Sequence, residues 1–372
     1  MRFPEFTEEW EKHTIGELCE EFKSGKNIKA ENIQEGGVYP VFGGNGLRGY
    51  ADRYNHEGDY VLIGRQGALC GNVRFVTGKT YITEHAIAAK ATNNNYTRFL
   101  EYLFVRLNLG QFSDQSAQPG LAVNKLLKIE TFVPSKEEQY KIASLLKFLD
   151  ERIATQNKII EKLESLIKGL NDSLYERYGD GIRTSFAELG YSYSGLSGKS
   201  AGDFGKGKPF ITYLNIYSNN VVNENDYQYV QIDEGEKQNV VQYGDVLFTL
   251  SSETPEEVGI GAVYLGQDKV YLNSFCFGIH IMNEELAYPP YISYYVSSTP
   301  FRKFIYPFAQ GSTRFNLCKA DFERASITLP SLDNQKRIHS VLNSITMKIN
   351  TEKAMLEQYV TQKKHLLRQM FI

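Results

Sequence analysis

The sequence has few of the residues on which metal centres, disulfide frameworks and membrane spans depend. Its six histidines show no HExxH or comparable metal-ligand spacing, and no apolar run is long enough for a signal peptide or a membrane span. The cysteines are widely spaced and form no CxxC pair. They are Cys19, Cys70, Cys276 and Cys318. We therefore expect a cytoplasmic protein with no metal site and no membrane association.

The chain also lacks an excess of charge of one sign. Its 41 basic and 44 acidic side chains leave a formal net charge of -3. A protein that coats nucleic acid without sequence preference needs a broad basic surface, so this class is excluded, although local basic loops remain possible. The 25 tyrosines and 22 phenylalanines favour strands, and 372 residues favour two or three domains.

Nucleotide-binding motifs are nearly present, but each lacks a residue that its chemistry requires. A phosphate-binding loop needs a glycine five residues before Gly-Lys-Ser/Thr. Tyr193 stands at that place before the GKS at Gly198, and Val73 before the GKT at Gly78. Neither segment is interpreted as a nucleotide loop.

A methyltransferase motif is also incomplete. FGGNG at Phe42 fits the F-x-G-x-G of S-adenosylmethionine-binding methyltransferases, but YPPY at Tyr288 has a tyrosine where Asn/Asp-Pro-Pro-Tyr needs a carbonyl acceptor. We interpret the glycines after Phe42 as a turn and Pro289-Pro290 as a loop or the start of a helix. His85 follows Glu84 in TEHA, and we interpret it as a structural or DNA-contacting histidine rather than as half of an acid–base pair. We expect no enzymatic activity in this chain.

One element occurs twice. VPSKEEQYKIASLL begins at Val133, and LPSLDNQKRIHSVL begins 196 residues later at Leu329. Each leads into apolar residues spaced alternately by four and three, which is typical of a long helix with a heptad seam. Ser135 and Glu138 are expected to form a capping box at the start of the first helix. The predicted seam positions are Ile142, Leu146, Leu149, Ile153, Ile160, Ile338, Leu342, Ile345, Ile349 and Leu356.

Each seam is interrupted by a polar residue at the same repeat position, Gln156 in the first and Glu352 in the second. A buried polar residue costs stability in a coiled coil but can determine its register and orientation. The alternative is that both residues face solvent where the seam drifts.

The remaining sequence consists of short apolar runs separated by Gly, Asn and Asp, which predicts strands joined by turns. A helical pattern starts at Thr97 and is expected to end at Gly110. GDVLFTL at Gly244 echoes GDYVLIG at Gly58, and AQG at Ala309 echoes AQPG at Ala117. We predict an α+β fold in which two mixed α/β domains with β-rich cores, 1–134 and 178–330, are each followed by a long helix, 135–177 and 331–372.

Several long phrases carry a resemblance to a known family. They are RFPEFTEEWEKHTIGEL at Arg2, VFGGNGLRGYADRY at Val41, GDYVLIGRQGALCGNV at Gly58, GLSGKSAGDFGKGKPFITYLNIY at Gly195, and the two PSxxxQxxI helix starts. With the duplicated architecture, these phrases resemble the DNA specificity subunit of type I restriction-modification systems. The resemblance covers essentially the whole chain.

The resemblance implies a non-catalytic, DNA-binding subunit with two target-recognition domains, each reading one half of a split site in double-stranded DNA. The two helices would pair as an antiparallel coiled coil with pseudo-two-fold symmetry and separate unlike half-sites by a constant number of bases. Two methyltransferase subunits and the restriction/translocase subunits would be its partners. S-adenosylmethionine, ATP and Mg²⁺ would belong to those partners, and this chain would hold no cofactor.

Candidate DNA contacts were sought among side chains that can bond base edges and that lie near turns. In the first domain they are Arg48, Arg65, Gln66, Lys79 and Gln118; in the second they are Lys199, Lys206, Lys208, Ser251, Ser252, Thr313 and Arg314. For each of them the alternative is an ordinary solvated surface group. Extra apolar positions on the first helix, Leu145, Phe148 and Leu166, are expected to be exposed and to contact a methyltransferase.

Two other classes of function remain open. A stand-alone or fused DNA methyltransferase would need the cofactor motif and the Asn/Asp-Pro-Pro-Tyr that are incomplete here. A coiled-coil scaffold would bind protein or glycan and show no DNA sequence preference.

Overall fold

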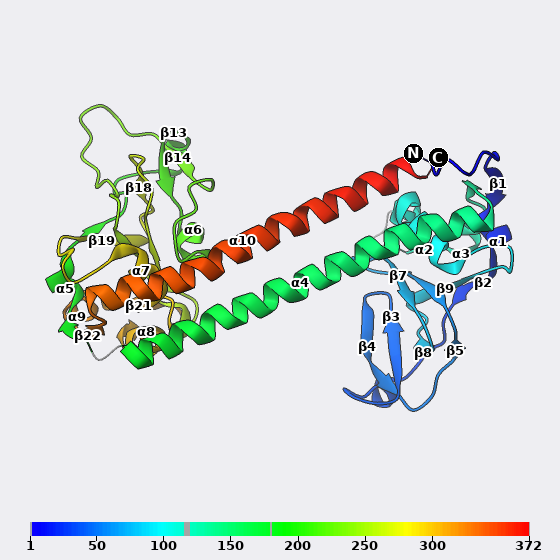
Figure 1. Cartoon of the computed structure of the whole chain (residues 1–372), viewed down its shortest axis with the longest axis horizontal. Coiled ribbons are helices and arrows are strands. Elements are labelled where there is room, and N and C mark those ends of the chain that lie inside the picture. Colours follow the sequence, from blue (N-terminus) through cyan, green and yellow to red (C-terminus); the bar gives the residue numbers. More distant parts are fainter. Residues whose placement is uncertain (1, 115–119, 179–180, 372) are drawn as a thin grey trace. The chain divides into compact units, whose positions relative to one another are not determined.

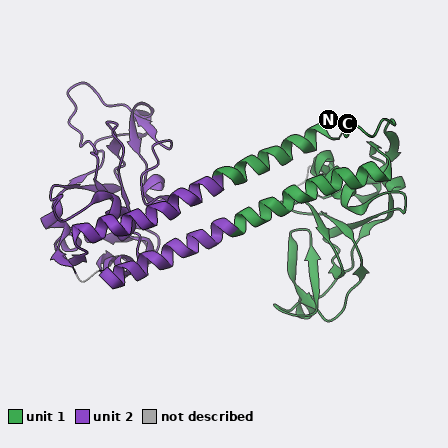
Figure 2. Cartoon of the chain, in the orientation of Figure 1, with its two compact units in different colours: residues 1–158, 354–372 green, residues 159–353 purple. Residues whose placement is uncertain are grey.

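The computed structural model describes residues 2–114, 120–178 and 181–371. The chain forms two compact units (Figure 2). Unit 1 consists of residues 1–158 and 354–372, and unit 2 of residues 159–353. Each unit combines antiparallel and mixed sheets with helices, which confirms the predicted α+β class (Figure 1).

Unit 1 is built on a four-stranded antiparallel sheet. In sheet order its strands are β2 (Cys19–Ser24), β9 (Ala86–Ala91), β6 (Tyr60–Gly64) and β7 (Val73–Val76). All five residues of β6 are buried, because the strand is covered on both faces. One face packs against α2 (Thr97–Leu107), and the other against the second sheet of the unit.

The second sheet of unit 1 contains a hairpin, and its turn lies at FGGNG, where the sequence predicted a turn. In sheet order its strands are β4 (Gly46–Ala51), β3 (Tyr39–Gly43), β8 (Lys79–Ile82) and β5 (His56–Glu57). Strands β3 and β4 are antiparallel, whereas β3 and β8 are parallel. The remaining elements are β1 (Glu11–Thr14), α1 (Ile15–Leu18), η1 (Ala30–Asn32), η2 (Leu109–Phe112), α3 (Val123–Leu126) and β10 (Glu130–Val133).

The predicted helix at Thr97 is confirmed, but its predicted end at Gly110 was wrong. Helix α2 stops at Leu107, and Asn108 follows in the left-handed region with φ 47°. Asparagine tolerates this conformation, so it can end a helix in place of glycine. Gly110 lies beyond it in η2.

Unit 2 repeats the main sheet of unit 1 with different side chains. In sheet order the strands are β12 (Gly190–Ser194), β19 (Cys276–Ile281), β15 (Val246–Thr249) and β17 (Gly261–Val263). A second sheet consists of β14 (Gln228–Val230), β13 (Phe204–Ile211) and β18 (Tyr271–Leu272), and a third of β16 (Ser251–Ser252), β21 (Phe315–Leu317) and β20 (Ala309–Gln310). The last pair is β11 (Ile182–Thr184) with β22 (Ile327–Leu329).

Short helices complete unit 2. They are α5 (Phe186–Leu189), α6 (Tyr213–Ser218), α7 (Pro289–Tyr295), α8 (Thr299–Ile305) and α9 (Lys319–Arg324), with the 3-10 turns η3 (Ala201–Asp203), η4 (Pro255–Glu257) and η5 (Tyr306–Phe308). Pro289 and Pro290 open α7, as the sequence suggested, because proline suits the first helical turn, where no intrahelical donor is needed.

The two repeated elements form long helices, α4 (Lys136–Tyr178) and α10 (Leu332–Gln369). In unit 1 the beginning of α4 packs with the end of α10, and Asp150 forms an ion pair with Lys363. In unit 2 the end of α4 packs with the beginning of α10, and Lys353 Nζ lies 2.7 Å from Glu164 Oε1. The two helical segments of each unit therefore run antiparallel (Figure 1).

The seam residues form the contact side of these helices. Buried members are Ile142, Leu146, Leu149, Ile160, Ile338, Leu342 and Ile349, and half-buried members are Ile153, Ile345 and Leu356. The polar interruptions Gln156 and Glu352 are each only 5% exposed. The sequence left open whether they are buried in the seam or face solvent, and the structure shows that they are buried. Lys348, one helical turn before Glu352, forms an ion pair with it.

The repeated glutamine of the PSxxxQ phrase connects each long helix to its own unit. Gln139 Oε1 accepts from the backbone N–H of Tyr96 at 2.9 Å, directly before α2. Gln335 Oε1 accepts from the N–H of Tyr288 at 2.8 Å, directly before α7. Both side chains are at most 1% exposed, and their amide groups donate to nearby carbonyls, including that of the proline that precedes the helix. The repeated sequence therefore specifies a buried joint between helix and sheet domain.

The predicted capping box at Ser135 is not formed. The Glu138 carboxylate is 1% exposed and accepts two bonds from Arg2, Nε to Oε1 at 2.8 Å and Nη2 to Oε2 at 2.7 Å. A bidentate pair with an arginine is stronger than a hydrogen bond to one backbone amide. The Glu138 carboxylate therefore bonds Arg2 of the N-terminal segment and does not cap the start of the helix.

Candidate nucleic-acid interface

A polar recess of about 370 Å³ lies in unit 1 at the turn between β3 and β4. It is lined by Gly43, Gly44, Asn45, Arg48, Gln66 and His85. Two glycines let the backbones approach: a Cβ on Gly44 would lie 2.7 Å from the His85 oxygen, and one on Gly64 would lie 2.5 Å from the Leu69 oxygen. The N–H of Arg65 donates to the His85 carbonyl at 2.9 Å, which joins the two loops of the recess.

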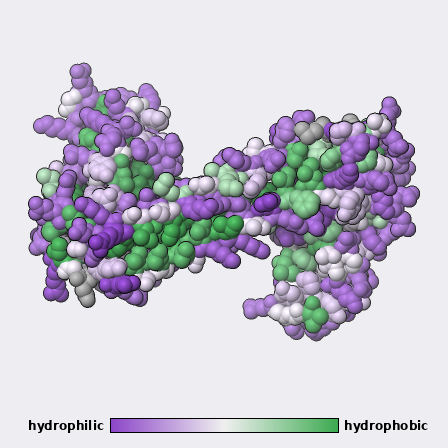
Figure 3. All heavy atoms as spheres, in the orientation of Figure 1, coloured by the Kyte–Doolittle hydropathy of each residue, from purple (hydrophilic) through white to green (hydrophobic). Residues whose placement is uncertain are grey.

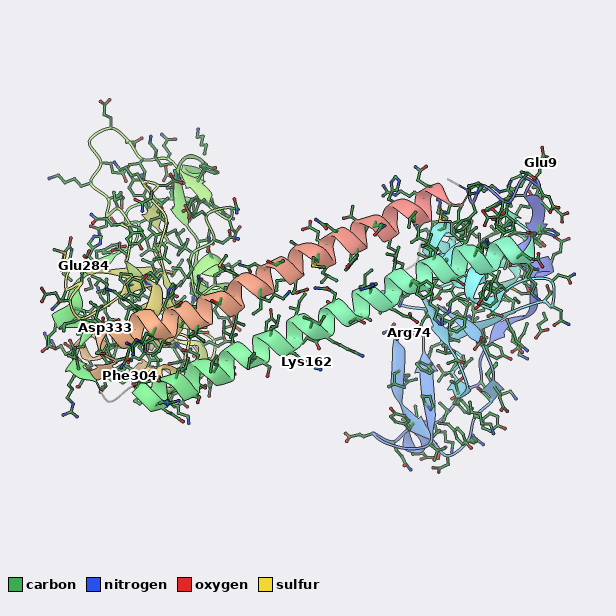
Figure 4. The ribbon with its side chains drawn as sticks, in the orientation of Figure 1. Glu9, Arg74, Lys162, Glu284, Phe304 and Asp333 are labelled. Carbon is green, nitrogen blue, oxygen red and sulfur yellow. The ribbon has the colours of Figure 1, made fainter. Side chains whose placement is uncertain are left out.

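The side chains of this recess carry hydrogen-bond donors and acceptors. His85 Nδ1 lies 3.3 Å from Gln66 Oε1, and His85 Nε2 lies 3.3 Å from Glu84 Oε1. Arg48 is exposed and makes no ion pair with any residue that the structure describes. Arg74, labelled in Figure 4, reaches the same hairpin, since its Nη2 would be 3.1 Å from a Cβ on Gly46.

Two other candidates of the first domain, Arg65 and Lys79, are not among the lining residues of the recess. Arg65 is half-buried and contributes its backbone. Lys79 lies at the start of β8, whereas the recess lies beyond its end; its Nζ is 3.8 Å from Glu57 Oε1 and 4.9 Å from the Tyr54 ring centre. Gln118 lies outside the described residues.

A larger recess, about 690 Å³, lies in unit 2. It brings together four of the predicted residues, Ser251, Ser252, Thr313 and Arg314, from two segments about 60 residues apart. The other lining residues are Tyr213, Leu214, Tyr217, Glu253 and Glu257. Tyr213 donates to the Ser251 carbonyl at 2.8 Å, so the first turn of α6 is attached to β16.

The two recesses occupy the same place in the two domains. In each, a strand parallel to its neighbour ends beside the recess: β3 pairs with β8 at Phe42 and Ile82, and β13 pairs with β18 at Ile211 and Leu272. The next contribution comes from the residues that leave the central strand, Gln66 after β6 and Ser251 after β15.

The strand pairing next to each recess also corresponds between the two domains. Gln66 forms a bridge with Gly120, and Ser251 pairs with Asn316. The segments before Gly120 and Asn316 carry the AQPG and AQG echoes. Gly120, the last residue of the AQPG echo, and Asn316, which follows the AQG echo, therefore make corresponding contacts.

The electrostatics of the two recesses differ. Glu257 accepts from Tyr217 Oη at 2.6 Å and from Ser252 Oγ at 3.0 Å, and these bonds lower the pKa of Glu257 below its usual range. The Arg314 guanidinium lies 6.0 Å from the Phe275 ring centre. The unit 2 recess therefore has two carboxylates and one cation in its lining, whereas the unit 1 lining has an arginine and no carboxylate.

The three lysines predicted as a basic loop are not grouped at the unit 2 recess. Lys199 Nζ lies 2.5 Å from Glu236 Oε2, only 8% of the lysine side chain is exposed, and this bond is the main reason that the pKa of Glu236 falls to about 2. Lys206 and Lys208 are exposed on β13, at the opposite end of the strand from α6.

Several lining residues were missed by the sequence prediction. They are Asn45 in unit 1 and Tyr213, Leu214, Tyr217, Glu253 and Glu257 in unit 2; Arg74, which reaches the unit 1 hairpin beside the recess, was missed too. Asn45 stands between two glycines of the turn and so carried a weak signal, and the interpretation of His85 as a structural or DNA-contacting residue agrees with its place in the lining. The others are ordinary surface residues in sequence, and only the fold brings them to the recess.

A model of the type I restriction modification DNA specificity domain matches residues 7–165 and again 198–360. The chain belongs to this family. The two matched stretches agree with the internal duplication, and membership confirms the resemblance drawn from the sequence. Among the helices of the described residues, none is long and apolar enough to cross a membrane.

Relatives of this family agree with the assignment. The chain is 42% identical over 154 residues to the EcoprrI specificity subunit of Escherichia coli, a match that covers 40% of this chain but only 38% of that protein. It is 21% identical to the putative specificity subunit S.HindORF215P of Haemophilus influenzae, across 92% of this chain and 89% of that protein. Because these relatives are named as specificity subunits of restriction enzymes, they agree with the prediction that this chain is not itself an enzyme.

Solved structures of the family share the fold. The S subunit of a type I system from M. genitalium superposes with a TM-score of 0.65 at 17% identity and covers the whole chain and 97% of the neighbour. A chain from a study of complex assembly in a type I system gives 0.60 at 15% identity, with 98% of each chain covered.

Proposed function

We propose that this specificity-family chain reads a bipartite DNA site, one half-site at the unit 1 recess and the other at the unit 2 recess. The observation that carries the proposal is the equivalent position of the two recesses in two domains of one family. Arginine, glutamine and asparagine in the first can bond guanine or adenine edges, and hydroxyl groups and Arg314 in the second can bond other edges. Because the two linings differ, the two half-sites should differ.

The long helices would separate the two half-sites by a constant spacer. Helix α4 has 43 residues, which corresponds to about 65 Å at the usual rise. A paired helix of this length is stiff, whereas a flexible linker would allow many spacings.

The outer faces of the same helices would bind two methyltransferase subunits, and the complete complex would add restriction/translocase subunits in the cytoplasm, where its DNA is. Apolar side chains gather along the helical part of unit 2 (Figure 3). Phe148 is 65% and Leu166 52% exposed, in support of the proposed contacts. The expectation that Leu145 is exposed was wrong: its side chain is half-buried and packs against the unit 1 core.

A charge on this face tests the proposed docking. Phe148→Glu and Leu166→Glu should reduce co-purification with the methyltransferase subunit, since a carboxylate cannot be buried there without a partner. Ala154→Glu adds a carboxylate at an exposed position of α4, about a third of a turn around the helix from Phe148 and Leu166, and is the control. Undiminished co-purification of both Phe148→Glu and Leu166→Glu would place the docking surface elsewhere.

DNA selection tests the function as a whole. The chain is co-purified with the methyltransferase subunit of its own system, and bound duplexes are recovered from a random pool and sequenced. We expect two unlike half-sites around a spacer of one length. A complex that forms but selects no motif would indicate a scaffold, and saturable S-adenosylmethionine binding by the isolated chain would indicate a methyltransferase.

A further inference from the structure

Glu253 stands on a well-ordered part of the unit 2 recess. The two residues before it form β16, in which Ser251 pairs with Asn316 and Ser252 with Phe315. Two residues after it, Pro255 opens η4. Backbone pairing on one side and a proline on the other restrict the conformations of this short segment, so the side chain is presented from a defined position.

Its carboxylate is available, whereas the other carboxylate of the recess is not. Glu257 is occupied by the hydroxyl groups of Tyr217 and Ser252. Glu253 is exposed and has no hydrogen bond or ion pair with the described residues. Within a recess proposed to face DNA, one acceptor-only side chain is thus left without a partner in the protein.

A free carboxylate has few favourable partners on duplex DNA. It is repelled by phosphates, which are the commonest contacts of DNA-binding proteins. The hydrogen-bond donors on the major-groove edges are the exocyclic amino groups, N4 of cytosine and N6 of adenine. Glutamate side chains of DNA-binding proteins accept hydrogen bonds from cytosine N4. A negative charge at this place therefore weakens contact with the backbone and favours one kind of base edge.

We propose that Glu253 determines specificity in the unit 2 half-site by accepting a hydrogen bond from the exocyclic amino group of a cytosine or an adenine. The inference rests on the proposed function and adds the chemical class of base edge that this domain reads. No carboxylate lines the unit 1 recess, so this kind of contact distinguishes the second half-site from the first.

The experiment compares Glu253→Gln and Glu253→Ala with the unchanged chain, each in complex with the methyltransferase subunit. Glu284→Gln is the control for the loss of one negative charge. Glu284 is exposed in the same unit, beyond the end of β19, whereas the recess lies at the start of that strand (Figure 4).

In random-pool selection, Glu253→Ala should lose preference at one or two adjacent positions of a single half-site, whereas Glu253→Gln, which keeps an acceptor oxygen and gains an amide donor, should favour adenine there. The discrimination lost should be about ten- to a hundredfold, the range of a good base contact. The second half-site and the spacer should stay unchanged, which also shows that the variants fold and assemble. Glu284→Gln should select the same motif as the unchanged chain.

The second step removes the amino group from the DNA. At the affected base pair, adenine is replaced by purine, or cytosine by 2-pyrimidinone, both of which lack it. The unchanged chain should lose about ten- to a hundredfold in affinity, and Glu253→Ala should lose little. Which replacement has this effect distinguishes adenine from cytosine.

Three results separate failure of this inference from failure of the function. If the unchanged chain selects no motif, the proposed function itself fails. If it selects a bipartite motif that Glu253→Ala selects equally, only the role of Glu253 is overturned. The role is equally overturned if removal of the amino group weakens the unchanged chain and Glu253→Ala by the same factor.

Discussion

At the scale of single residues, the proposed DNA interface depends on side chains without an ion-pair partner among the described residues. Arg48 and Arg314 line their recesses and form no ion pair with a described residue. Lys199 was also selected as a basic residue near a turn, but it forms an ion pair with Glu236. Composition near a turn therefore does not identify a DNA contact, because an opposite charge from elsewhere in the chain can occupy the side chain first.

Arg314→Ala should relax base preference in the unit 2 half-site alone. A bidentate contact to a base is worth about 1–3 kcal/mol of discrimination, and binding to mismatched sites should change little. Arg48→Ala should have the corresponding effect on the other half-site. Selection from the random pool measures both effects, with the exposed Arg324→Ala as control. An equal loss of affinity on every sequence would instead identify a phosphate contact.

The buried His56 should make unit 1 less stable at mildly acid pH. Burial lowers the pKa of His56 below its usual 6.5, although Glu21 Oε1 lies 3.0 Å from its Nε2. The unfolded chain therefore takes up this proton first, and the free energy of unfolding falls as pH decreases below about 6.5. Thermal melts of the unchanged chain and His56→Gln at pH 7.5 and 5.5 measure this difference.

The advantage of the unchanged chain over His56→Gln should shrink at pH 5.5. Other groups that titrate in this range, such as His339, are present in both proteins and cancel in the comparison. A difference in melting temperature that is the same at both pH values would show that His56 does not cause the acid sensitivity.

At the scale of elements, the glutamine of the repeated PSxxxQ phrase connects each long helix to the sheet domain of its own unit. It is not needed to start the helix. Gln139 and Gln335 each bond the backbone directly before a second helix, α2 or α7, and are buried there. The phrase could be read as a helix start from sequence, since Pro-Ser marks one. The reason for the glutamine could not be read, because the backbone N–H that its side-chain oxygen bonds lies more than 40 residues away.

Gln335→Ala should destabilise unit 2 on the order of 2 kcal/mol, because it leaves the buried N–H of Tyr288 and two carbonyls without a partner. Hydrogen exchange should speed up in the first turn of α7, and in Gln139→Ala it should speed up in the first turn of α2. Gln362→Ala, an exposed glutamine of α10, is the control. Unchanged exchange at both helix starts would refute the joint.

At the scale of the whole molecule, the paired helices are proposed to determine the spacer between half-sites. Both polar interruptions of the seam, Gln156 and Glu352, are buried. A buried polar residue in a coiled coil is tolerated best in one register, so these two residues are candidates for keeping the helices aligned. The described ion pairs Asp150 with Lys363 and Glu164 with Lys353 enclose Gln156 on α4, and Glu352 lies directly before Lys353 on α10.

One additional heptad in each helix should lengthen the spacer. The insertions belong between Asp150 and Glu164 in α4 and between Lys353 and Lys363 in α10, where seven residues preserve the seam. They add about 10 Å of helix, which corresponds to about three base pairs. Random-pool selection should recover both original half-sites with the longer spacer. A spacer of unchanged length would contradict the proposal, and a four-residue insertion that breaks the seam should impair assembly.

The sequence by itself determined the features that depend on local order. The heptad spacing placed α4 and α10 within one or two residues of their observed starts, and the long shared phrases identified the family. The hairpin at FGGNG and the helix opened by Pro289 followed from the conformations that glycine and proline favour. These features involve residues close together in the chain, so they leave a pattern in the sequence.

The tertiary structure alone decided which of the chosen residues act together. Ser251 and Ser252 meet Thr313 and Arg314 because β16 pairs with β21, while Lys79 lies at the far end of its strand from Arg48 and Gln66. It also decided that Glu138 pairs with Arg2 and that Glu253 is left free. Strand order and pairing bring distant residues into contact, and these contacts determine which side chains remain available to DNA.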